Sequence, residues 1–112
     1  MEDATSEGTL TLEFHGALAD RFRPFGTRRG TRTRVTVNCA PTLSDLLTRL
    51  VLVNPEYAHV YDAEKRSLPE HVEVVLNDRV IELQGGLNAP LREGDVVAFL
   101  PAHAGGAIPP SA

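Results

Sequence analysis

The sequence predicts an α+β domain of two layers, in which one main helix packs on one face of a sheet of about five strands. Two observations lead to this prediction. Alternating apolar and polar residues mark short strands on both sides of a single strongly amphipathic segment, and turn-forming residues separate these segments. The chain of 112 residues is long enough for one small domain with a single core.

Two strands are predicted before the helix. Residues 9–15 alternate between apolar and polar side chains, and residues 32–39 do the same. Cys39, the only cysteine, shares the apolar face of the second strand, so we interpret it as a small core residue and not as a reactive thiol. The connection between the strands is rich in Gly and Arg, and residues 17–22 fit a short helical turn within it.

The main helix is predicted to begin after Pro41-Thr42. Thr42 and Asp45 form an acidic version of the capping box, which satisfies backbone N–H groups at a helix start. Asn54-Pro55 ends the helix, because proline disfavours helical geometry in the residue before it. Residues 55–70 show no period and are expected to form a loop or a short second helix. The apolar residues at helical spacing are Leu43, Leu46, Leu47, Leu50 and Val53.

Three further strands are predicted after the helix. Residues 72–76 and 80–83 are rich in aliphatic side chains, and Asn77-Asp78-Arg79 between them fits a tight hairpin turn. Residues 84–94 are expected to form a loop, and the last strand follows at residues 95–101. The predicted order is therefore strand, strand, helix, strand, strand, strand.

The last strand predicts an apolar surface outside the core. If Val97 and Phe99 face the helix, their neighbours in the strand face the other side of the sheet, where water is expected. An exposed apolar patch of this kind usually marks a site for a protein partner. The candidate residues of this site are Val80, Val96, Ala98 and Leu100.

Composition limits the classes of function. The net charge of −4 and the lack of aromatic residues spaced to stack bases argue against a nucleic-acid partner. No segment approaches the roughly 18 apolar residues of a membrane span, and the acidic start is not a signal peptide, so we expect a cytoplasmic protein without membrane contact. The histidines lack metal-ligand spacing and no catalytic motif is present, so we expect neither an enzyme nor a bound metal.

The basic residues are unevenly distributed. Six of the 11 basic residues fall between positions 21 and 34, with no acidic residue among them. Such a cluster is either a solvated loop that leads into a strand or a grip for phosphate or an acidic partner. Its members are Arg21, Arg23, Arg28, Arg29, Arg32 and Arg34.

The C-terminal part of the chain resembles a known family. The segment Phe99-Leu100-Pro101-Ala102-His103-Ala104-Gly105-Gly106 is similar to the end of the MoaD/ThiS family of ubiquitin-like sulfur carrier proteins. The similarity includes Asn77 in the hairpin and extends over most of residues 9–106. It implies a β-grasp fold with a mixed sheet. The implied organisation is a flexible N-terminal segment (1–8), a β-grasp domain (9–101) and a flexible C-terminal tail (102–112) that contains Gly105-Gly106.

The resemblance also implies a function as a sulfur carrier precursor. In this family an activating enzyme uses ATP and Mg²⁺ to adenylate the terminal glycine, which would here be Gly106 beside Gly105, and sulfur then replaces AMP to give a thiocarboxylate. The carrier supplies no catalytic group and binds no cofactor. Six residues follow Gly106, so the resemblance implies cleavage between Gly106 and Ala107 by a metalloprotease of the JAMM type.

Partner contacts follow from the same resemblance. Leu100 matches a position where small subunits of molybdopterin synthase carry a large apolar interface residue, and Pro101 adjoins it. His103 would act in docking or as a spacer. The partners implied are the activating enzyme, the protease and an enzyme that accepts the sulfur for biosynthesis of a cofactor or another metabolite.

Two other functions remain open at this point. A ubiquitin-like modifier would use the same activated Gly106, but a lysine amine would attack it in place of sulfur. A β-grasp binding module would dock a protein without any activation of its glycine.

Overall fold

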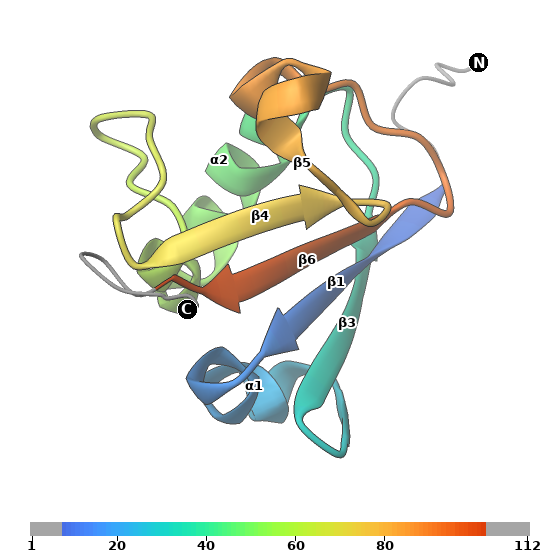
Figure 1. Ribbon diagram of the computed structural model, residues 1–112, viewed down its shortest axis with the longest axis vertical. Coiled ribbons are helices and arrows are strands. Elements are labelled where there is room, and N and C mark those ends of the chain that lie inside the picture. Colours follow the sequence, from blue (N-terminus) through green and yellow to red (C-terminus); the bar gives the residue numbers. More distant parts are fainter. Residues whose placement is uncertain (1–7, 103–112) are drawn as a thin grey trace, which may run out of the picture.

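The structure, a computed structural model, describes residues 8–102. It contains a six-stranded sheet with the strand order β2-β3-β1-β6-β4-β5 (Figure 1). The main helix, α2 (Leu43–Val53), lies behind the sheet in this view, and a short helix, α1 (Ala17–Phe22), follows β1. The strands are β1 (Thr9–His15), β2 (Thr27–Arg29), β3 (Arg32–Asn38), β4 (Val72–Leu76), β5 (Arg79–Val80) and β6 (Val96–Pro101). The predicted two-layer α+β architecture is confirmed.

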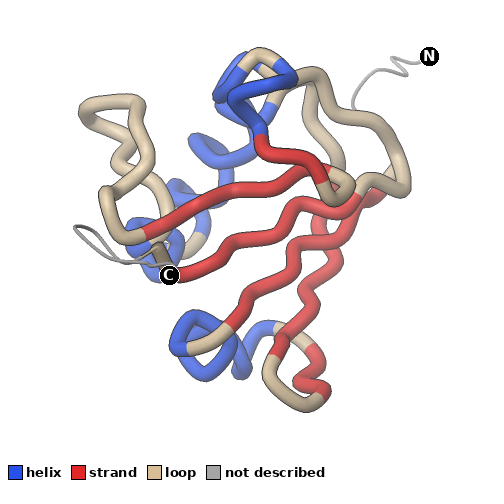
Figure 2. Tube along the Cα trace, viewed as in Figure 1, coloured by secondary structure: helices blue, strands red, loops and turns tan. Residues whose placement is uncertain are grey.

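The last strand occupies the middle of a mixed sheet. β6 pairs in parallel with β1 and antiparallel with β4, and β1 pairs antiparallel with β3. Figure 2 shows these long strands side by side, with helical segments at the margins and behind them. The chain therefore leaves the sheet from a central strand that has a neighbour on each side.

The core lies between the sheet and the helices. Phe14 of β1 stacks on Phe22 of α1, with ring centroids 4.0 Å apart, and on Phe99 of β6, with centroids 5.0 Å apart. This aromatic cluster fixes α1 and the second half of β6 to the same side of the sheet. Cys39 is buried in the core, as predicted.

The start of α2 forms as predicted. The backbone N–H of Asp45 donates to Thr42 Oγ1 at 3.2 Å, and the Thr42 hydroxyl donates to the Asp45 carboxylate at 2.9 Å. The four leucines of the predicted stripe are buried. Val53 was expected to join them and does not, since its side chain is 73% exposed. It is the last residue of α2, and after it the chain turns at Asn54 so that Tyr57 supplies the next buried side chain.

The hairpin between β4 and β5 is shorter than predicted. Asn77 and Asp78 have φ angles of 51° and 70°, which make a two-residue turn of type I′. The predicted strand at residues 80–83 is wrong beyond Val80, because residues 81–84 form a 3₁₀ helix. Side-chain hydrogen bonds and the burial of an apolar residue both favour this helix. The Gln84 Nε2 donates to the carbonyls of Arg79 (2.9 Å) and Leu76 (3.1 Å), and Ile81 turns into the core.

The Arg-rich connection contains a strand that the sequence did not predict. Residues 27–29 pair antiparallel with β3, so that β2 forms one edge of the sheet. Of the two alternatives given for the arginine cluster, the solvated loop does not describe residues 27–29, because they form a strand. Thr27-Arg28-Arg29 gives no apolar alternation, because an edge strand with little contact to the core needs none.

Candidate functional site

The candidate site is the face of the sheet opposite α2, which we call the outer face. In β6, Val97 and Phe99 are fully buried on the helix side. The residues between them in the strand are half-buried and point to the outer face: Val96, Ala98 and Leu100. The predicted register of this strand is confirmed.

Strand pairing extends this surface sideways. Ala98 lies opposite Val75 of β4, and Val75 lies opposite Val80 of β5, so the three side chains form one row on the outer face. Val75 was not predicted as part of the site, because its position depends on the register of two strand pairs. We call this group the apolar patch: Val75, Val80, Val96, Ala98 and Leu100.

The end of β6 is held in place up to Ala102. The N–H of Ala102, one residue beyond the exposed Pro101, donates to the carbonyl of His71 at 2.7 Å. A methyl group added at Gly16 would meet the Pro101 ring at 2.9 Å, so the start of α1 lies close against the strand end. The other predicted site residues lie outside the described residues: His103, Gly105, Gly106 and Ala107.

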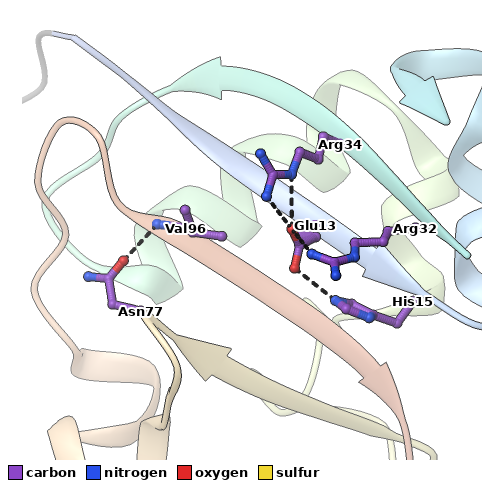
Figure 3. A network of polar contacts seen from close by, with 6 residues as sticks. All are labelled: Glu13, His15, Arg32, Arg34, Asn77 and Val96. Atoms are coloured by element: carbon purple, nitrogen blue, oxygen red, sulfur yellow. Dashed lines mark hydrogen bonds and ion pairs between the residues drawn. The ribbon is translucent and has the colours of Figure 1, made fainter. Parts of the chain in front are cut away.

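The start of β6 is fixed by a side chain from the hairpin. Asn77 accepts a hydrogen bond from the Val96 N–H at 2.9 Å (Figure 3). Its Nδ2 donates to the Asp95 carboxylate at 3.0 Å. Its backbone N–H donates to the Val96 carbonyl at 2.9 Å. Asn77 therefore joins the β4–β5 hairpin to β6, which gives a structural reason for an Asn at this turn.

The other half of the outer face is polar and centred on Glu13. This carboxylate is almost fully buried, with 7% of the residue exposed. Its Oε2 accepts hydrogen bonds from Arg34 Nε at 2.9 Å and Arg32 Nη1 at 3.4 Å, and its Oε1 lies 2.8 Å from His15 Nε2 (Figure 3). Sequence reasoning missed this network, because the arginines lie on another strand and are far from Glu13 along the chain.

These partners keep Glu13 ionised. Burial alone raises the pKa of the Glu13 carboxyl, because the charged form loses hydration. Hydrogen bonds from His15 and Arg34, together with the positive charge of Arg34, outweigh burial, so the pKa lies below its ordinary value. The Glu13 carboxylate can therefore hold Arg34 and Arg32 on the outer face at neutral pH.

Two features are absent from the part of the chain that the structure describes, residues 8–102. No group of three or more His, Cys, Asp or Glu side chains is placed to hold a metal ion in this part of the chain. No helix formed by these residues is long and apolar enough to cross a membrane.

Solved structures with a similar fold define the class of this protein. The HVO 2177 protein of Haloferax volcanii is 25% identical with a TM-score of 0.57, and the match covers 94% of each chain. The small archaeal modifier protein 1 (SAMP1) of Methanosarcina acetivorans is 18% identical with a TM-score of 0.61, over 88% of this chain and 97% of that chain. A chain of the Amycolatopsis orientalis BexX/CysO complex is 22% identical with a TM-score of 0.58, over 87% of this chain and 99% of that chain. The protein therefore has the ubiquitin-like β-grasp fold, as the resemblance implied.

The family follows from a direct match. The ThiS family model matches residues 25–106, which is most of the chain, and the protein belongs to this family. The MoaD/ThiS resemblance is thereby confirmed. Among curated protein sequences, none matches this chain. Its fold is that of the small ubiquitin-like sulfur carriers and protein modifiers.

Proposed function

We propose that this protein is the precursor of a sulfur carrier whose reactive group is the carboxyl of Gly106. The observation that carries this proposal is the extent of the family match, which ends at Gly106 although the chain continues to residue 112. The central strand β6 leads toward this glycine and is anchored up to Ala102. The carrier presents a carboxyl group, and its partners perform the catalysis.

The chemistry requires a free carboxyl at Gly106. A carboxylate is a poor electrophile, so its oxygen first attacks the α-phosphate of ATP, which forms the acyl adenylate and releases pyrophosphate. The terminal sulfur of a persulfide then attacks the acyl carbon and AMP leaves. A thiol cleaves the resulting acyl disulfide, and the thiocarboxylate remains on Gly106. The ATP and Mg²⁺ belong to the activating enzyme, and we propose that the reaction takes place in the cytoplasm.

The outer face provides the docking surface for that enzyme. Four residues beyond Ala102 extend at most about 14 Å, so the active site that receives Gly106 must lie close to the end of β6. The apolar patch surrounds this strand, with Leu100 two residues before Ala102. A partner that covers the patch is therefore correctly placed to receive the tail. We propose that Pro101 and His103, which flank Ala102 in the sequence, also contact this partner.

Processing must precede activation. In the full chain the carbonyl carbon of Gly106 belongs to an amide bond with Ala107, and an amide has no carboxylate oxygen to attack ATP. We infer that a metalloprotease of the JAMM type cleaves this bond. A biosynthetic enzyme then accepts the sulfur. The BexX/CysO complex, which contains a structurally similar chain, supports an enzyme partner of this kind.

A second candidate is a protein modifier. The similarity to SAMP1, which is named as a modifier protein, supports it at the level of the fold. In that case a lysine amine would attack the acyl adenylate of Gly106, and the product would be an isopeptide bond to another protein.

The intact mass of the protein isolated from its host tests these alternatives. A sulfur carrier will have lost residues 107–112 and will carry sulfur in place of one oxygen, a gain of roughly 16 Da over the truncated chain, as the atomic masses of sulfur and oxygen require. A modifier will appear in adducts with other proteins and without the added sulfur. A chain that keeps residues 107–112 as its only cellular form would contradict both functions.

A further inference from the structure

The apolar patch continues into a charged surface along the sheet. One row of cross-strand neighbours crosses all six strands on the outer face: Val80, Val75, Ala98, Glu13, Arg34 and Thr27. The row is apolar on β5, β4 and β6 and polar on β1, β3 and β2. A partner that covers one half of the face therefore lies beside the other half.

The polar half contains a hollow lined by arginines. Thr27, Arg29, Arg32 and Arg34 surround a volume of about 600 Å³, and we call this the arginine hollow. Arg29 lies opposite Arg32 in the β2–β3 pair, and Thr27 lies opposite Arg34. Three guanidinium groups are thus gathered on two neighbouring strands.

The positive charge of the hollow is only partly neutralised. Among residues 8–102, Glu13 is the carboxylate that contacts the hollow, so the three guanidinium groups and this carboxylate leave two positive charges. Within residues 8–102, no ion pair joins Arg29 to a carboxylate. Arg28, beside it in β2, differs because it is paired with Asp20.

Arg32 and Arg34 can also bind an anion, because they keep free N–H donors, are restrained and remain accessible. Arg34 uses Nε and Nη2, and Arg32 uses Nη1, to contact Glu13 Oε2. A guanidinium has five N–H donors, so both groups keep donors for another acceptor. Glu13 restrains them, which lowers the entropy lost when an anion binds. Their side chains remain 51% (Arg32) and 58% (Arg34) exposed, so an incoming group can reach them.

We propose that the arginine hollow binds carboxylates of an acidic segment on the protein that covers the apolar patch. Guanidinium groups bind carboxylates through paired hydrogen bonds, and a shared face allows one partner to use both halves. Nucleic acid fits less well, because neither the hollow nor the patch contains Phe, Tyr or Trp for base stacking. The proposal rests on the proposed function only for the identity of this partner, which is the activating enzyme.

A peptide titration tests the hollow without any activation of Gly106. The ¹⁵N-labelled full chain is titrated with hexaglutamate in about 0.1 M salt. At this ionic strength the Debye length is about 10 Å, so electrostatic interactions over longer distances are screened. The amide signals of residues 27–34 are expected to shift. Arg29→Glu is expected to raise the Kd by about tenfold, because it places a carboxylate in the hollow. Lys65→Glu makes the same charge change in a loop outside the sheet, and its Kd should stay within about twofold of the original.

The outcomes separate this proposal from the proposed function. An unchanged Kd in Arg29→Glu, or shifts confined to other residues, would overturn the arginine hollow as a carboxylate site. Tighter binding of hexauridylate than of hexaglutamate at residues 27–34 would overturn its assignment to an acidic protein. Hexaglutamate binding at the hollow by a chain that never acquires a thiocarboxylate in its host would reject sulfur transfer and retain the hollow.

Discussion

Glu13 organises the polar half of the outer face. Its carboxylate is buried under Arg34, Arg32 and His15, and these contacts exist only in the folded chain. The Glu13 pKa is lowered on folding, so this group adds to stability above its unfolded pKa of about 4.5. That contribution is lost as the pH falls through the lower, folded-state pKa.

Glu13→Gln is expected to destabilise the protein by about 1 to 2 kcal/mol at pH 7, since a charged hydrogen-bond acceptor is replaced by a neutral one. The loss should shrink as the pH falls below the unfolded-state pKa of the Glu13 carboxyl, because protonation then removes the charge that the folded state stabilises. Denaturant unfolding of both proteins between pH 2 and pH 7 measures this. Glu73→Gln removes an exposed carboxylate from β4 and should change stability by less than about 0.5 kcal/mol. A Glu13→Gln loss that stays constant down to pH 2 would contradict the account.

Little of this network can be read from the sequence. Glu13 occupies a polar position of an alternating strand, and such a position usually faces water. Its burial depends on Arg34, which becomes a neighbour only through the antiparallel pairing of β1 and β3. Val75 is a similar case, because its place between Ala98 and Val80 depends on the register of three strands.

At the level of single elements, α2 carries the core. Leu47→Ala is expected to cost about 2 to 5 kcal/mol, because Leu47 is fully buried and the change leaves a cavity. Leu52→Ala removes the same atoms from a side chain that is 81% exposed and should change stability by less than about 0.5 kcal/mol. Denaturant unfolding of both variants checks this. Similar losses in the two would mean that α2 does not cover the sheet in solution.

The elements whose apolar residues recur at a regular spacing were predictable, and the others were not. β1, β3 and α2 follow from alternation and helical spacing, because each buries one face against the core. β2 has no such period, since edge pairing and not burial holds it. Residues 81–84 carry a strand-like composition, yet hydrogen bonds from Gln84 hold them in a 3₁₀ helix.

Leu100 tests the role of β6 as a docking strand. Glu73 lies opposite Leu100, so Leu100→Asn is preferred to an aspartate that would create a like-charge pair. We expect Leu100→Asn to keep the thermal transition and to weaken binding to the activating enzyme by about tenfold, as loss of an interface anchor does. Calorimetric titration measures the affinity. Leu83→Asn, the same change at an exposed site outside the patch, should bind normally. Equal affinities for the two variants would exclude the apolar patch as the docking surface.

At the scale of the whole molecule, the folded domain positions the last strand, and the proposed reaction takes place on a glycine that follows this strand in the sequence. The β-grasp core fixes the central strand β6 from Asn77 at its start to Ala102 at its end. The proposed reactive glycine follows four residues later, and a partner on the outer face is within its reach. The fold class and the apolar residues of β6 were predictable from the sequence, whereas the polar half of the site emerged only from the strand order.

The most direct test of the central claim compares the full chain with a chain that ends at Gly106. Each is mixed with ATP, Mg²⁺ and the activating enzyme of the same host, and exchange of pyrophosphate into ATP is measured. We expect exchange for the truncated chain only, because only that chain has a free carboxyl on Gly106. In the truncated chain, Gly106→Ala should slow exchange without changing stability, since a β-carbon obstructs a channel shaped for glycine. Equal exchange by the full and truncated chains would contradict the account.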